Sequence, residues 1–338
     1  MRTLSLAFAA LAVASLPVRA DDTSAVLAAG ELVLEKTDRI ALAAEDLYLS
    51  EQVVRIDYRF RNLADADIET TVAFPMPDIT GDPATLVSIP DPARDNFLRV
   101  ATEVDGRLVE SQVEQRAFLA RSGSPPVEIT DRLKALDIPL MPTVEATEVA
   151  LRRIGEGQRR ALAEAGILER QVHKDGTIAD VPVWRLTSKL WHRQVFPAGR
   201  EIVVRQSYAP SLGGQSSLSF GSPDLDPSQQ AQYVARFCTD AAFEKVAQAL
   251  YRRASADGSR AFQAYEQYLT HVIASGDNRA GPIGTFRLVV DKGDPATLVS
   301  FCGSNVKKTG PTTYEMVAKD YVPQRDIDVL FLKIGHRG

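Results

Sequence analysis

The chain has 338 residues, of which 45% are hydrophobic and 25% are charged, and its formal net charge at pH 7 is −5. This length and composition are typical of a globular protein of one or two domains with a large core. The acidic balance disfavours a nucleic-acid partner, because such a protein repels phosphate backbones.

The first twenty residues predict an export leader. A positive start at Arg2 precedes an apolar run over residues 4–16, and the small-x-small pattern of Val18-Arg19-Ala20 is typical of a signal-peptidase site. We expect cleavage after Ala20 and a mature protein that is periplasmic or secreted. No other stretch is long and apolar enough to cross a bilayer, so we expect no transmembrane segment in the mature chain.

Two cysteines, Cys238 and Cys302, are present in the sequence. An exported protein with two cysteines usually pairs them, which predicts a structural disulfide. Free thiols are the alternative. A redox role is less favoured, because the chain has no Cys-x-x-Cys motif.

The first part of the mature chain reads as strands. Residues 53–60 alternate between apolar and charged side chains, which indicates a strand with one buried face. A second strand is expected from Ile68 to Phe74, ending at Pro75, which lacks a backbone donor. Asp105-Gly106 predicts a two-residue hairpin.

The middle of the chain changes character after the Ser- and Pro-rich residues 122–126. Residues 127–168 are rich in Ala, Leu, Glu and Arg and predict two or three short helices. Strands are then expected over 181–196 and 201–208. The helices therefore read as an insertion between strands of one β domain.

The last third is predicted as a helical segment followed by strands. Apolar residues at near-helical spacing indicate helices over 228–275, with a break at 257–259. Residues 291–294 are expected to form a hairpin turn between strands 286–290 and 297–301. The four strands expected here are 286–290, 297–301, 313–317 and 329–334.

Together these patterns predict an α+β, mainly β fold, an antiparallel β-sandwich with a helical insertion and a C-terminal helix-plus-sheet lobe. The expected organisation is a leader over 1–20, a sandwich domain over 21–124 and 181–222, an insertion over 125–180, and the lobe over 223–338.

Several motifs resemble those of an exported bacterial family known as a domain of unknown function. They are Phe74-Pro75-Met76-Pro77-Asp78, Phe196-Pro197-Ala198-Gly199, Tyr208-Ala209-Pro210 and Val299-Ser300-Phe301-Cys302. The resemblance covers nearly the whole mature chain and implies a β-rich exported protein without an assigned activity. Gln206 departs from the family pattern, where histidine is expected, which weakens a histidine-based site there.

A weaker resemblance is to the vault/inter-alpha-trypsin-inhibitor domain, an extracellular interaction module. Residues 58–75, Asp105-Gly106-Arg107 and residues 114–119 carry it. The chain has no Asp-x-Ser-x-Ser motif, so the adhesion domain that usually follows this module is not expected.

No catalytic motif is visible. The sequence has no Gly-x-Ser-x-Gly elbow, no His-Glu-x-x-His zinc motif and no glycine-rich phosphate loop, and its four histidines are scattered. We expect no cofactor and no metal site, and we read the acidic pairs in loops as solvated turns.

The binding candidates lie on the aromatic strand: Trp184, Trp191, His192 and Arg193. Period-two alternation places Trp184 and His192 on one face and Trp191 and Arg193 on the other. An exposed tryptophan beside an arginine suits a sugar, a peptide or a ligand ring. Burial in the sandwich core, covered by the inserted helices, is the alternative.

The sequence therefore favours a non-enzymatic exported binding protein of the bacterial envelope, whose partner is a protein or a small extracytoplasmic ligand. An envelope-polymer hydrolase that uses an Asp/Glu pair is one alternative, and a structural accessory of a surface or secretion assembly is another. The helical insertion is a further candidate surface for a partner protein.

Overall fold

The structure is a computed structural model that describes residues 29–30, 32–34, 38–81, 88–121, 123–215, 217–256, 262–273 and 280–336. The expected leader over 1–20 and the expected break at 257–259 lie outside the described residues. The chain is α+β and mainly β, as predicted, with three principal sheets, a two-stranded hairpin and five helices in the described part.

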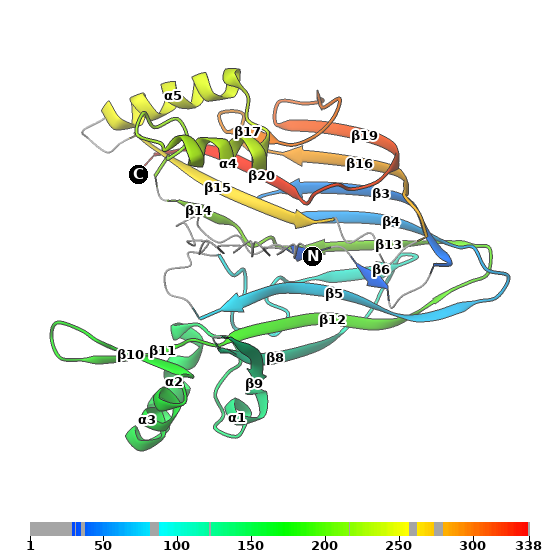
Figure 1. Cartoon of the computed structure of the whole chain (residues 1–338). Helices are drawn as coiled ribbons and strands as arrows, with labels where there is room; N and C mark the ends of the chain where they lie inside the picture. Colours follow the sequence, from blue (N-terminus) through cyan, green and yellow to red (C-terminus); the bar gives the residue numbers. More distant parts are fainter. Residues whose placement is uncertain are drawn as a thin grey trace, which may run out of the picture.

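The main sheet has eight strands and forms the back layer in Figure 1. Within this sheet β3 and β16 pair in parallel, and every other pair of neighbouring strands is antiparallel. In spatial order the strands are β18 (Lys307–Lys308), β19 (Thr313–Tyr321), β16 (Ile283–Asp291), β3 (Ile40–Ser50), β4 (Val54–Asn62), β13 (Glu201–Tyr208), β6 (Ala101–Val104) and β7 (Arg107–Leu108).

Two five-stranded sheets complete the layers, one above the other in Figure 1. The upper sheet contains β1 (Ala29–Gly30), β15 (Phe262–Val272), β20 (Ile327–His336) and β17 (Leu298–Phe301), with β14 (Gly213–Gln215) also on β15. The lower sheet contains β2 (Val33–Leu34), β5 (Ile68–Thr80), β12 (Arg185–Phe196), β8 (Gln112–Arg121) and β9 (Ser124–Glu128).

The segment of β1 and β2 joins the upper and lower sheets. Ala29 and Gly30 pair in parallel with β15, and a few residues later Val33 and Leu34 pair antiparallel with β5. The largest hydrophobic core draws on all three sheets, with Tyr58, Phe74 and Phe331 among its fully buried side chains. The predicted division into domains stays a prediction.

Helices cover both ends of the molecule (Figure 1). Next to the lower sheet lie α1 (Thr130–Lys134), α2 (Val144–Arg153) and α3 (Glu156–Glu164), followed by the hairpin of β10 (Leu168–Val172) and β11 (Ile178–Pro182). Trp184 anchors this insertion, because it is buried in a second core with helix residues such as Leu133 and Leu151. On the upper sheet lie α4 (Pro227–Phe237) and α5 (Ala241–Ala256).

Several sequence expectations hold. Strand β4 buries Val54, Ile56, Tyr58 and Phe60 and exposes the charged residues between them. Asp105 and Gly106 both have positive φ, 48° and 78°, and they connect β6 to β7, as a hairpin of this type requires. Alternation of apolar and charged residues therefore predicted the strand correctly where, as in β4, one of its faces is exposed to solvent.

Residues 262–272 form strand β15, so the predicted helix there is wrong. Both faces of this strand are covered: Tyr268 packs in the core under α4 and α5, whereas Leu269 belongs to the core beneath the main sheet. A strand that is buried on both faces lacks polar alternation, and its aromatic residues then mimic helical spacing.

Two turn expectations are also corrected. Residues 291–294 do not form a hairpin, because β3 and β19 already occupy both edges of β16, and the chain crosses to the upper sheet to form β17. Strand β5 continues beyond Pro75 to Thr80. On one side the described pairing with β2 ends at Ala73, so no described ladder bond on that side requires the N–H that Pro75 lacks.

Candidate functional site

The four residues predicted as binding candidates do not converge on one site. Trp184 is buried, and its indole N–H donates to the Leu140 carbonyl at 2.8 Å, so it presents no surface to a ligand. His192 is also buried, and burial lowers its pKa. Trp191 is half-buried and Arg193 is exposed, with its guanidinium 2.9 Å from Glu69. A binding role for this last pair stays a prediction.

A better candidate lies between α4 and the upper sheet, where the structure has a cavity of about 490 Å³. This volume falls within the range of small-molecule sites, roughly 300–1,000 Å³. We call it the α4 cavity. Its lining residues are Gln215, Ser219, Leu225, Gln229, Gln232, Tyr233, Ala235, Arg236, Phe237 and Tyr268.

The side of α4 that lines the cavity combines polar and aromatic side chains. Gln229, Tyr233 and Arg236 are half-buried and recur at helical spacing, and the exposed Gln232 lines the cavity beside them. The cavity therefore has hydrogen-bonding groups in its lining as well as aromatic rings.

The beginning of α4 is firmly set. Asp226 is the N-cap and accepts a hydrogen bond from the Ser228 N–H at 2.7 Å, and Pro227 occupies the first turn. These local signals fix where the helix begins, and hence which of its residues face the cavity.

A buried carboxylate lies beside the cavity. Glu266 of β15 has no exposed surface, and it accepts hydrogen bonds from the backbone N–H groups of Ser219 and Phe220. The hydroxyls of Tyr233 and Tyr268 also donate to it, the former at 2.6 Å. Four donors compensate the lost hydration of this charge without a partner cation.

The two tyrosines remain neutral. Burial and the neighbouring Glu266 carboxylate raise the pKa of Tyr233 and of Tyr268 far above the ordinary value. Both hydroxyls therefore act as donors to Glu266, and the rings of Tyr233 and Tyr268 are held at the cavity wall with Phe237.

Arg236, the cation that lines the α4 cavity, also has partners that compensate its charge. The Arg236 guanidinium pairs with Asp328 of β20 at 3.0 Å and donates to the Thr270 hydroxyl at 3.2 Å. Its Cζ lies 4.9 Å from the centroid of the Phe237 ring, in a cation–π contact. Arg236 is thus oriented by three groups while one edge faces the cavity.

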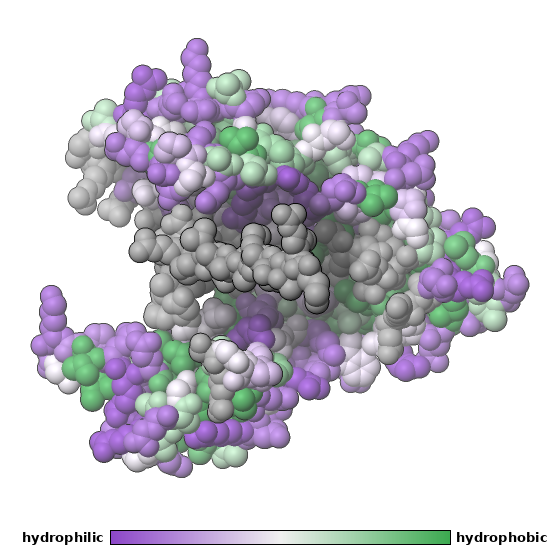
Figure 2. Space-filling view, in the orientation of Figure 1, coloured by the Kyte–Doolittle hydropathy of each residue, from purple (hydrophilic) through white to green (hydrophobic). Residues whose placement is uncertain are grey.

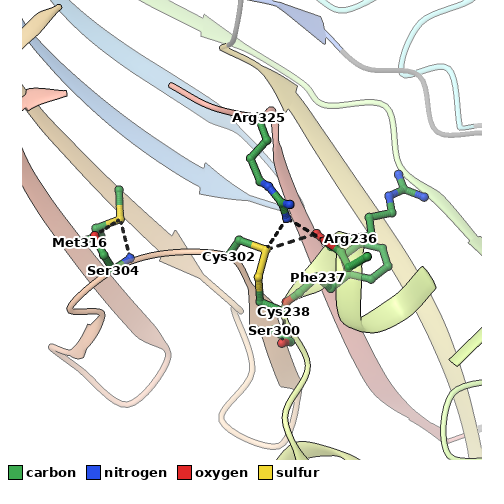
Figure 3. The surroundings of a disulfide bond; sticks show 9 residues. Arg236, Phe237, Cys238, Ser300, Cys302, Ser304, Met316 and Arg325 are labelled. Atoms are coloured by element: carbon green, nitrogen blue, oxygen red, sulfur yellow. Dashed lines mark hydrogen bonds between the residues drawn. A yellow bond between two sulfur atoms is a disulfide. The ribbon is translucent and has the colours of Figure 1, made fainter. Parts of the chain in front are cut away.

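The C-terminal end of α4 is held by the predicted disulfide, which the structure confirms (Figure 3). Cys238 is the C-cap, with a left-handed φ of 53°, and its partner Cys302 directly follows β17. The bridge spans 64 residues, for which the chain-entropy model gives about 4 kcal/mol of stabilisation. It fixes the helix to the sheet that carries the cavity wall.

A larger depression of about 890 Å³ lies between the 92–95 loop and the helical insertion. Its apolar lining includes Val113, Ile138 and Met141, and its charged lining includes Lys134 and Asp137. No buried carboxylate or ring cluster comparable to that of the α4 cavity converges there in the described part of the chain, so we give the α4 cavity precedence.

Within the described ranges no three His, Cys, Asp or Glu side chains cluster so that they could hold a metal ion. None of the helices described there is long and apolar enough to cross a membrane. The cavity residues offer amide, hydroxyl, guanidinium and aromatic groups, which suit non-covalent binding.

Sequence reasoning missed this site. A signal was present: Gln229, Gln232 and Arg236 fall on the same helical face as Tyr233 and Phe237. Glu266 was out of reach, because the segment that carries it was assigned to a helix, and the loop that donates to it is nearly 50 residues away.

The comparisons concern the family and the fold. A family model described as "Domain of unknown function (DUF4424)" matches residues 20–330, and no curated protein matches the chain. Among solved structures, a "putative nutrient binding protein" from Legionella pneumophila is 12% identical over 92% of this chain and 72% of its own, with a TM-score of 0.46.

A second similar structure is the M1 zinc metallopeptidase of Deinococcus radiodurans, which is 10% identical. The match covers 87% of this chain and 43% of the peptidase, with a TM-score of 0.23. Similarities at this level assign neither a ligand nor an activity to this chain.

Proposed function

Because this chain belongs to the DUF4424 family, whose description states no activity, we propose from its own geometry that it is an exported binding protein that holds a small extracytoplasmic ligand in the α4 cavity. The observation that carries the proposal is the inner face of α4. Its polar and aromatic residues line a ligand-sized cavity, and the adjoining buried carboxylate is already saturated with donors.

Binding is favoured over hydrolysis by the state of the nearby acids. A glycosidase-type hydrolase needs two carboxyl groups that face one cleft, about 5–10 Å apart. Glu266 and Asp328 are both committed to hydrogen bonds, and the described lining of the α4 cavity holds neither aspartate nor glutamate. The groups that remain free can hold a ligand but offer no acid–base pair.

The export part of the proposal rests on the leader pattern. Cell fractionation combined with N-terminal sequencing tests it directly: the mature protein should be recovered outside the cytoplasm and should begin at Asp21. An intact N-terminus on cytosolic material contradicts it.

The binding part is tested by blocking the cavity. The protein is dialysed against a small-molecule extract of the growth medium, and the retained compounds are identified by mass spectrometry. Wild type should retain a compound that Gln232→Trp loses, because the indole fills the cavity. Ala231→Trp, at an exposed position of the same helix outside the lining, is the matched control and should retain it. Equal retention by both variants rules the cavity out.

A protein partner is a second candidate, favoured by the β10–β11 hairpin. Val172 and Ile178 face each other across the strands, and 72% and 51% of their surfaces are exposed. Figure 2 shows hydrophobic surface beside the hydrophilic end of the hairpin that projects from the lower part of the molecule. A photo-crosslinker at residue 172 should trap a specific protein, whereas the same group at residue 195, an exposed valine on β12, should not.

A further inference from the structure

The charges around the α4 cavity are balanced before any ligand arrives. Arg236 is the one charged residue among the described lining, and it is paired with Asp328. Glu266 receives two backbone N–H and two tyrosine hydroxyl donors. An anionic ligand would compete with Asp328 for the guanidinium, and a cationic ligand would find no free carboxylate. An uncharged ligand meets neither cost.

The free polar groups are amides on opposing walls. The side-chain amides of Gln229 and Gln232 have no hydrogen-bond partner among the described residues. Across the cavity, the Gln215 amide oxygen accepts from the Ser219 hydroxyl, so its N–H groups remain available. A carboxamide both donates and accepts, as does a hydroxyl group. Such walls complement a ligand with hydroxyls around its perimeter.

The aromatic wall offers one ring that is partly accessible. Phe237 and Tyr268 are buried and stacked on each other at 5.5 Å, with 13° between the planes, whereas Tyr233 is half-buried and tilted by 41° from Phe237. The negative face of an aromatic ring attracts the weakly positive C–H face of a saturated sugar ring. Polar amides around the Tyr233 ring thus provide for both the rim and the face of such a ring.

We propose that the α4 cavity binds an uncharged saccharide, a mono- or disaccharide, with Gln229 and Gln232 bonded to its hydroxyls and the Tyr233 ring against its ring. This inference rests on the proposed function and names its ligand class. Planar uncharged heterocycles such as nucleosides could also stack on the wall. They are disfavoured because the amides lie on opposing walls of the cavity, whereas a nucleoside base has hydrogen-bonding groups on fewer of its sides.

Isothermal titration tests the class with five probes: glucose, galactose, maltose, citrate and adenosine. At least one sugar should bind wild type, and the double variant Q229A/Q232A should weaken that binding on the order of tenfold, since two hydrogen bonds are lost. Q230A is the matched control on the same helix and should bind like wild type.

The outcomes separate the two proposals. Binding of citrate or adenosine, but of no sugar, that weakens in Q229A/Q232A keeps the cavity as the site and overturns the saccharide class. Sugar binding that is unchanged in Q229A/Q232A overturns the assigned contacts. If no probe binds and the blocking variant Gln232→Trp also changes no retained compound, both the class and the proposed function fall.

Discussion

The guanidinium of Arg325 lies 3.0 Å from the sulfur of Cys302. The same Nη1 donates to the carbonyl oxygen of Ala235 in the last turn of α4 at 2.7 Å. One arginine therefore touches both the disulfide and the C-terminal end of the helix that lines the cavity (Figure 3). A cation at this end also interacts favourably with the helix dipole.

This contact makes a prediction about reduction of the bridge. When a thiol attacks Cys238, Cys302 leaves as a thiolate, which the Arg325 charge stabilises. Arg325→Gln should slow reduction by dithiothreitol several-fold, and Arg325→Lys, which keeps the charge, should restore most of the rate. Alkylation of the released thiols at timed intervals measures it. Equal rates for wild type and the glutamine variant would show that the charge does not act on the sulfur.

Glu266→Gln should destabilise the fold by about 2–4 kcal/mol, because an amide cannot accept from four donors and its own N–H₂ group would face the tyrosine hydroxyls. Urea denaturation gives the free energy of unfolding. Glu110→Gln, at an exposed position, is the control and should change it by less than about 0.5 kcal/mol. A similar small effect at residue 266 would mean that its charge is not needed.

His271 predicts a loss of stability in acid. It is buried, its Nδ1 lies 2.9 Å from the Tyr208 hydroxyl, and burial lowers its pKa from 6.5 to about 4. Between these two pH values the His271 side chain binds a proton in the unfolded chain but not in the folded protein. Stability from this group is therefore full above pH 6.5 and falls by about 3 kcal/mol as the pH drops to 4.

The measurement compares urea unfolding of wild type and His271→Leu across this pH range. The variant is less stable at pH 7 but should show a shallower decline below pH 6.5. The comparison between the two proteins is needed because His192, whose pKa burial also lowers, contributes with the same sign in both. Parallel declines would assign the acid sensitivity to other groups.

Gly221 sets the loop that donates to Glu266 against α5. Its φ is +91°, and a Cβ at this position would lie 2.7 Å from the carbonyl carbon of Ala247. Gly221→Ala should therefore cost about 2–3 kcal/mol from strain and steric overlap. Gly166→Ala separates the two causes, because its φ is +71° with open space around it, and it should cost about 1 kcal/mol. Equal losses of unfolding free energy in the two variants would show that steric overlap with Ala247 does not contribute.

Local signals predicted much of the fold. Alternation predicted β4, and the Asp-Gly dipeptide predicted the turn at Asp105-Gly106, where the structure shows positive φ. These features depend on neighbours in sequence, so one chain is enough to read them.

The failures depend on neighbours in space. Phe262, Tyr265 and Leu269 gave a helical pattern in the sequence, whereas layers cover both faces of the strand that the segment forms, as the burial of Tyr268 and Leu269 in different cores shows. The site was missed for the same reason, because Glu266 meets Ser219, Phe220 and Tyr233 only after the loop, α4 and β15 have assembled. Trp184 was offered both as a binding residue and as core, and the helices that decide between these alternatives fold over it from elsewhere in the chain.

The segment of β1 and β2 that joins the upper and lower sheets has a consequence for the order of folding. Ala29 pairs with His271, and Leu47 pairs with Leu288. Strands from the beginning of the chain therefore pair with strands near its end. Such distant pairings form late, since the ribosome must release the last strands first. The upper and main sheets therefore cannot be completed until residues near the C-terminus are available for pairing.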